Sequence, residues 1–205
     1  MIAIATRPVV YNGIRHIVFV LPPFAVLGGV AAAWIAQRLS AYGRSAVIAG
    51  ALALIAGVAS PIVDMVRLHP YEYTDYNHLA GGVRGARNNF MLDYWGLSFK
   101  QAAQKLSAYV QRNRSADHNK VWTIAVCGPH PPVAVALGDK QYHIVWDPKG
   151  ADFAMVVGEF YCAKLEAPVL FDVTREGITY ARVYDLRGRD VTSLLTVPGI
   201  DKTNY

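Results

Sequence analysis

Two long apolar runs dominate the first third of the chain. The 21 residues between His16 and Arg38 include no ionisable side chain, and a second uncharged run covers 46–63, ending before Asp64. About 20 apolar residues in a helix cross roughly 30 Å of hydrocarbon. We therefore predict transmembrane helices over about 14–36 and 46–66, joined by a short polar connector. Neither run has a polar face, which disfavours two core helices of a soluble protein.

The first run also has features of a secretory signal peptide. A basic flank precedes it, and small residues lie near 31–33. However, it exceeds the usual apolar length of roughly 7–15 residues, and a second run follows at once. A soluble domain released by signal cleavage is therefore kept as an alternative to the hairpin.

Prolines and small residues modify this hairpin. Pro22 and Pro23 fall about one third of the way into the first predicted span, where they remove backbone donors and predict a kink. Ala49, Ala53 and Gly57 repeat at every fourth position. Such a stripe allows another helix to approach closely, although alanine and glycine are also common in membrane helices without that role.

The pattern changes after residue 67. Residues 68–97 are rich in aromatic residues and follow no regular period, which predicts a loop with short helical turns. Residues 98–113 have helical spacing, with Ser98 as N-cap and Gln101 completing a capping box. Apolar, β-branched segments predict strands at 121–128, 142–146, 152–158, 170–173 and 178–184, the last two forming a hairpin. The predicted fold class is thus a membrane α-helical hairpin (1–67), an aromatic-rich juxtamembrane loop (68–97) and a small α/β domain (98–205).

Composition narrows the function classes. Of the 205 residues, 53% are hydrophobic and 17% are charged, against about 25% charged in an average soluble domain. The net charge of +5 divides into +4 for residues 1–67 and +1 for the remainder, so the soluble part has no basic face for nucleic acid. No metal-ligand or cofactor motif is present, and we predict neither a metal site nor a cofactor. Cys127 and Cys162 are either two buried thiols or, in an oxidising compartment, a disulfide.

Three segments flank the predicted hairpin: YNGIRHIVFVLPP (11–23), HPYEYTDYN (69–77) followed by GG and GA, and FMLDYWGLSFKQA (90–102). In this order and spacing they resemble the C-terminal end of bacterial polytopic glycosyltransferases of the protein-mannosyltransferase-like superfamily. The resemblance covers about residues 9–106. It implies a sugar donor linked to polyprenyl phosphate, a place in the bacterial inner membrane, and an extracytoplasmic position for residues 68–205. Charge alone leaves the orientation open, because two arginines in the connector oppose three outside it.

The resemblance is incomplete. Enzymes of this superfamily have many more spans and carry their catalytic acid in an early extracytoplasmic loop, a region that this chain lacks. We therefore expect the C-terminal part of such an enzyme, not catalytic alone and with no catalytic residue to assign, whose partners are the lipid bilayer, a polyprenyl-phosphate sugar and the missing N-terminal membrane portion. The alternative is a stand-alone two-span protein that presents an α/β binding or scaffolding domain.

The resemblance also implies candidate contacts for substrate or lipid phosphate. An arginine can hold a phosphate through two parallel hydrogen bonds, but basic residues at helix ends also anchor helices by snorkelling. Tyrosines beside a membrane can equally form an interfacial belt, and an acid before a helix can equally fix that helix. The candidates are Tyr11, Arg15, His16, His69, Tyr71, Glu72, Tyr73, Asn77, Asp93, Tyr94 and Trp95.

Overall fold

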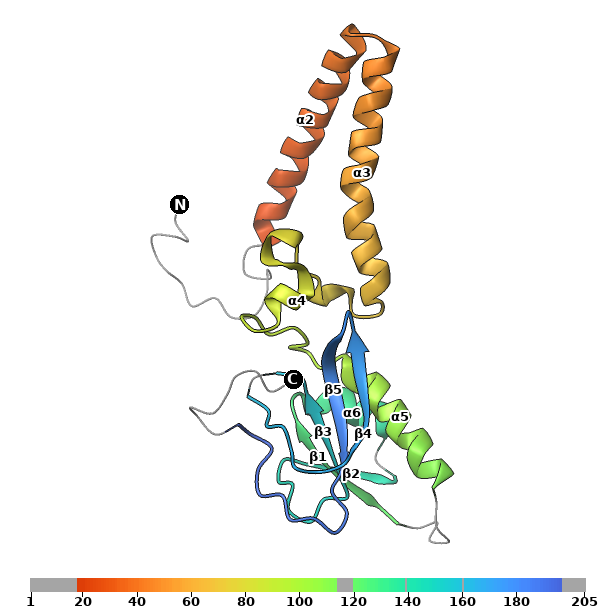
Figure 1. The fold of residues 1–205 in the computed structure, drawn as a ribbon, viewed down its shortest axis with the longest axis vertical. Coiled ribbons are helices and arrows are strands. Elements are labelled where there is room, and N and C mark those ends of the chain that lie inside the picture. Colours follow the sequence, from red (N-terminus) through yellow and green to blue (C-terminus); the bar gives the residue numbers. More distant parts are fainter. Residues whose placement is uncertain (1–17, 114–119, 139, 160, 197–205) are drawn as a thin grey trace, which may run out of the picture. The chain divides into compact units, whose positions relative to one another are not determined.

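A computed structural model describes residues 18–113, 120–138, 140–159 and 161–196 (Figure 1). The chain forms two compact units, residues 1–63 and residues 64–205. The predicted fold class is confirmed, since two long apolar helices are followed by an α/β unit with a five-stranded sheet. The aromatic-rich segment 68–97 belongs to the second unit.

The first unit contains helix α2 (Leu21–Ala41) and most of helix α3 (Arg44–Leu68), which runs on into the second unit. The helices form an antiparallel hairpin around a tight turn at Tyr42 and Gly43 (Figure 1). Both are long and apolar enough to cross a membrane, and no residue of their apolar windows is buried. The predicted connector at 37–44 was too long, because its residues up to Ala41 continue α2 and Arg44 already begins α3.

Two predictions about the hairpin change. Pro22 and Pro23 lie in the first turn of α2 rather than one third of the way along a helix, and a proline there removes no intrahelical hydrogen bond. The stripe of Ala49, Ala53 and Gly57 is exposed, and a Cβ on Gly57 would meet nothing within 4 Å. The close approach occurs instead at Gly50, where a Cβ would lie 2.3 Å from Leu39 Cδ1.

The second unit begins with the juxtamembrane segment, which folds into short helical turns as predicted. These are η2 (Glu72–Thr74), η3 (His78–Ala80) and α4 (Gly82–Ala86). Tyr71 is only 2% exposed, and its ring stacks on Tyr180 of the sheet at 5.7 Å between centroids. An interfacial-belt position for Tyr71 is therefore wrong, because the side chain is part of the core of the α/β unit.

The sheet contains β1 (Trp122–Cys127), β2 (Tyr142–Val145), β3 (Phe153–Val157), β4 (Val169–Arg175) and β5 (Ile178–Asp185) in the order β2-β1-β3-β5-β4. Strands β2, β1 and β3 are parallel, whereas β5 is antiparallel to β3 and β4. The predicted β4–β5 hairpin is confirmed. Every residue of β3 is buried, as its continuous apolar sequence indicated.

Two helices pack on the sheet. Helix α5 (Ser98–Arg112) contacts β3, β4 and β5, while α6 (His130–Leu137) contacts β2 and α5. The helical spacing of α5 places one apolar stripe in the core: Phe99, Ala102, Ala103, Leu106 and Val110. Helix α6 was not predicted. The prolines that end β1 also begin this helix, because its first turn needs no backbone donors.

The predicted capping box of α5 is wrong. Ser98 is the first helical residue, and no side chain caps the helix from the N-cap position. Instead, the Asp93 carboxylate accepts hydrogen bonds from the backbone N–H groups of Leu97 (2.9 Å) and Ser98 (3.0 Å) and from the Ser98 hydroxyl. Gln101 is engaged elsewhere, because its Oε1 accepts the Tyr71 hydroxyl at 2.7 Å.

The two cysteines, whose pairing the sequence left open, form a disulfide. Cys127 ends β1, and Cys162 lies in the segment after β3. Both side chains are buried. Disulfides persist in oxidising compartments, so the bond is consistent with an extracytoplasmic position of the α/β unit.

Candidate functional site

A pocket of about 770 Å³ lies at the carboxyl ends of the three parallel strands. Strand β1 lies between β2 and β3, so the connections leaving β1 and entering β3 run to opposite sides of it. In open α/β sheets, ligands bind outside the carboxyl ends of the strands at such a switch point. Position in the fold alone therefore makes this pocket the leading candidate site.

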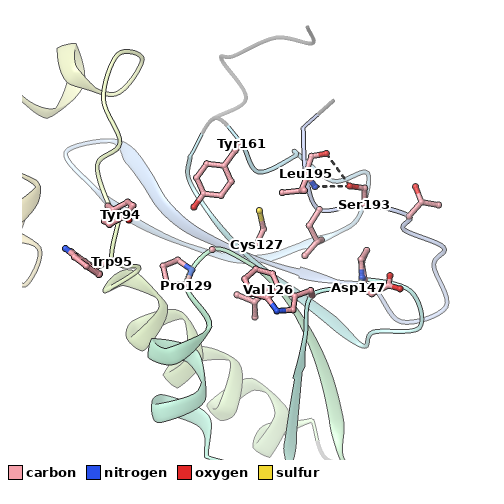
Figure 2. Close-up of a pocket in the computed structure, with 14 residues that line it drawn as sticks. Tyr94, Trp95, Val126, Cys127, Pro129, Asp147, Tyr161, Ser193 and Leu195 are labelled. Carbon is pink, nitrogen blue, oxygen red and sulfur yellow. Dashed lines mark hydrogen bonds between the residues drawn. The ribbon is translucent and has the colours of Figure 1, made fainter. Parts of the chain in front are cut away.

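Five segments of the α/β unit line the pocket. Figure 2 shows Tyr94 and Trp95 on one side and Ser193, Leu195 and Asp147 on the other, with the end of β1 between them. The described residues that line it are Tyr94, Trp95, Val126, Cys127, Gly128, Pro129, Trp146, Asp147, Pro148, Tyr161, Thr192, Ser193, Leu194 and Leu195.

The turn after β1 depends on a glycine. Gly128 has a φ of 135°, and a Cβ there would lie 2.8 Å from the ring of Phe99. Only glycine adopts such a backbone conformation readily. The chain can thus turn closely over α5 and enter α6 at the edge of the pocket.

Aromatic side chains present large surfaces to the pocket. Trp146 is 70% exposed, although one face of its indole stacks on His130 at 3.6 Å between centroids. Burial lowers the pKa of His130, so the imidazole is neutral at pH 7. Trp95 is 55% exposed and meets Tyr94 edge to face at 4.9 Å.

A few polar groups accompany these rings. Asp147 follows β2, and its Oδ1 accepts the backbone N–H of Lys149 at 2.9 Å. The Ser193 hydroxyl accepts the backbone N–H of Leu195 at 3.0 Å. Burial and nearby acids raise the pKa of Tyr161 to about 12. Among the described residues that line the pocket, none carries a cationic side chain.

Two buried carboxyl groups lie near the pocket, since both raise the pKa of its lining residue Tyr161. Asp93 is 1% exposed and also accepts the Tyr73 hydroxyl, while Glu159 is 4% exposed and accepts the backbone N–H groups of Leu92 (2.8 Å) and Asp93 (3.0 Å). Burial raises the pKa of Asp93 above its ordinary value. The hydrogen bonds that Asp93 accepts lower this pKa, but by less than burial raises it. Burial raises the pKa of Glu159 to about 7. Burial and the Asp93 charge raise the pKa of Tyr73.

The structure separates the sequence-predicted candidates. Tyr94 and Trp95 line the pocket, whereas Tyr73 and Asp93 do not line it and are hydrogen-bonded to each other. Tyr71 is held by Gln101 and by the Arg175 guanidinium, which lies 4.9 Å from its ring centroid.

The remaining candidates lie away from this pocket. Exposed His69 pairs with Glu72, and Asn77 caps η3 by accepting the Ala80 N–H at 3.0 Å. Tyr11, Arg15 and His16 lie outside the described residues.

A second pocket, of about 380 Å³, is lined by the juxtamembrane segment and the β4–β5 turn. Its charges are mixed. Asp64 lies 3.0 Å from His78, and Glu176 lies 3.9 Å from Arg84. Arg67, in the last turn of α3, also lines it and makes no ion pair with any described residue.

Sequence reasoning missed Trp146, Asp147, Tyr161 and Glu159. Trp146 ends a predicted strand, Asp147 and Glu159 directly follow predicted strands, and Tyr161 lies three residues after one. The carboxyl ends of parallel strands meet at one edge of a sheet. That signal becomes usable only once β1, β2 and β3 are known to be parallel neighbours.

No protein-family model, curated protein or solved structure matches the chain. The described residues hold no group of three or more His, Cys, Asp or Glu that could bind a metal ion.

Proposed function

We propose that this chain is the C-terminal part of a bacterial inner-membrane glycosyltransferase that uses a lipid-linked sugar donor, and that the chain does not transfer sugar by itself. The proposal takes its reaction class from the three sequence segments described above. Two helices of membrane length and a disulfide-bonded α/β unit fit an enzyme anchored in the membrane and facing an oxidising compartment.

The observation that carries the proposal is the second pocket. Arg67 lies in the last turn of the second apolar helix, and Arg84 lies in α4, within the segment that follows. Guanidinium groups bind phosphate oxygens through paired, charge-assisted hydrogen bonds. A polyprenyl phosphate held by its chain in the bilayer would present its phosphate at the end of such a helix.

Two of the three resembling segments contact each other. The Tyr73 hydroxyl, from 69–77, donates a hydrogen bond to the Asp93 carboxylate, from 90–102. This contact gives the two segments a common structural role, since Tyr73 helps to hold the residue that fixes α5. In this proposal Tyr73 and Asp93 are positioning residues. The sugar donor would be contacted by Arg67 and Arg84 and by the predicted pair Arg15 and His16.

Photolabelling tests this function. The full chain in lipid nanodiscs is exposed to a photoreactive, short-chain polyprenyl-phosphate sugar. We expect labelling that unmodified polyprenyl phosphate competes away, a several-fold loss of labelling in Arg67→Gln and Arg84→Gln, and no sugar transfer. Arg189→Gln is the matched control, because Arg189 is exposed in the same unit and lines neither pocket.

Two results would overturn the proposal. If unmodified polyprenyl phosphate does not reduce the labelling, the claim that the chain binds a lipid-linked donor is rejected. Turnover by the isolated chain removes the claim that it is not catalytic alone.

A stand-alone binding module is the second candidate function. The pocket at the strand ends favours it, because this pocket is formed entirely by the α/β unit. This candidate predicts ligand binding at that pocket together with the absence of competable lipid labelling in the same preparation.

A further inference from the structure

The pocket at the carboxyl ends of β1, β2 and β3 has the size and the mixed lining of a small-molecule site. Its volume of about 770 Å³ falls within the range of roughly 300–1,000 Å³ typical of such sites. The second pocket, to which we assigned the lipid phosphate, is lined by different residues.

The exposed indoles point to a ligand with flat, weakly polar faces. Trp146 and Trp95 remain largely exposed although each meets another ring. Exposed aromatic surface favours a ligand that removes it from water. The C–H groups on one face of a pyranose ring carry a small positive charge, which complements the negative face of an aromatic ring.

The polar groups select among such ligands. Asp147 offers a carboxylate, which can accept hydrogen bonds from two neighbouring hydroxyls, and Ser193 and Tyr161 add hydroxyl groups. No lining residue in the described part of the chain is cationic, and the carboxyl groups of Asp93 and Glu159 act electrostatically on the lining residue Tyr161. A phosphate or carboxylate ligand is therefore disfavoured.

Covalent and hydrogen-bond contacts link three of the segments that line the pocket. The Cys127–Cys162 disulfide ties the end of β1 to the segment that carries Tyr161. Backbone hydrogen bonds from Ala163 N–H to the Leu194 carbonyl (2.7 Å) and from Thr196 N–H to the Tyr161 carbonyl (2.9 Å) fix the opposite wall. A preorganised site loses less conformational entropy on binding.

We propose that this pocket binds a neutral saccharide unit that stacks on Trp146 and hydrogen-bonds to Asp147. The inference extends the proposed function and rests on it only for the source of the saccharide, which would be the acceptor of the transfer. The binding claim itself rests on the lining of the pocket.

Saturation-transfer NMR on the full chain tests it. The chain is held in nanodiscs, because glycoside detergents would compete, and is titrated separately with mannobiose and chitobiose. We expect at least one of them to give saturation transfer. In Trp146→Ala and in Asp147→Asn its affinity is expected to fall about tenfold or more. Phe90→Ala is the control, since Phe90 is an exposed aromatic residue outside the pocket.

Each outcome bears on a different claim. If neither sugar gives saturation transfer, the saccharide site is rejected. The same holds if saturation transfer is equal in wild type and in Trp146→Ala. Choline is included because aromatic side chains beside a carboxylate also suit quaternary ammonium ions, and binding of choline alone overturns the saccharide assignment. Lipid photolabelling tests the second pocket. If photolabelling fails but saccharide binding is observed, the proposed lipid-linked donor is rejected and the saccharide site is still supported.

Discussion

Glu159 Oε1 accepts a hydrogen bond of 3.0 Å from the backbone N–H of Asp93, and Asp93 in turn holds the start of α5. A buried carboxyl group at the end of β3 thus positions the acid that fixes a helix on the sheet. The residues between Asp93 and α5 include Tyr94 and Trp95, so the same contacts set one wall of the pocket.

Replacing Glu159 by glutamine is expected to flatten the pH dependence of stability. The folded pKa of Glu159 is about 7 against an ordinary value of 4.5, so the folded state retains a proton that the unfolded chain has already lost. The free energy of unfolding therefore falls as the pH rises from about 4.5 to 7, by up to about 3 kcal/mol. The glutamine side chain would keep an acceptor oxygen without this ionisation.

Chemical unfolding of the full chain, followed by near-UV circular dichroism at pH 5 and pH 8, measures this effect. We expect the loss of stability between the two pH values to be smaller in Glu159→Gln than in wild type. Glu166→Gln serves as control, because Glu166 is exposed. An equal loss in wild type and Glu159→Gln would show that Glu159 does not titrate in this window.

Asp93→Ala is expected to destabilise the α/β unit by about 3 kcal/mol. The substitution leaves two backbone N–H groups and the hydroxyls of Ser98 and Tyr73 without their acceptor, and each buried unsatisfied group costs roughly 1–3 kcal/mol. Ser98→Ala removes one donor and no acceptor, so it is expected to cost only about 1 kcal/mol. The same unfolding measurement compares them, and equal losses would argue against Asp93 as the residue that fixes α5.

Removing the disulfide is expected to lower stability by about 4 kcal/mol, since the cross-link closes a loop across a sequence separation of 35 residues. The double variant Cys127→Ala/Cys162→Ala and dithiothreitol-treated wild type should unfold at the same denaturant concentration. Dithiothreitol should not change the unfolding of the double variant, because that variant has no disulfide to reduce. A wild type insensitive to dithiothreitol would contradict the prediction.

The two apolar helices predict retention in the membrane. After alkaline carbonate washing we expect the chain in the membrane pellet, whereas a soluble domain released by signal cleavage would be in the supernatant. An alkaline phosphatase fused after Tyr205 should be active, because that enzyme folds only in an oxidising compartment. An inactive phosphatase with an active cytoplasmic reporter at the same position would place the α/β unit in the cytoplasm.

Local signals in the sequence were sufficient for most elements. The helical spacing of 98–113, the apolar run 152–158 and the hairpin formed by the last two predicted strands each agree with the observed structure, because periodicity and turn chemistry act over a few residues. The errors also have local causes. Ser98 and Gln101 have the spacing of a capping box, but Asp93 and Tyr71, which lie outside the helix, offer them buried partners.

The sequence by itself determined the two-part organisation of this protein, because the hydrophobic runs and the change of pattern near residue 67 are properties of contiguous segments. It also supplied the aromatic residues Tyr94 and Trp95 as candidates. Only the tertiary structure decided that Trp146, Asp147 and Tyr161 join them, that Cys127 pairs with Cys162, and that Glu159 is buried beside Asp93. These relationships depend on the order of strands in the sheet, which arises from packing between segments distant in the chain and has no local signature.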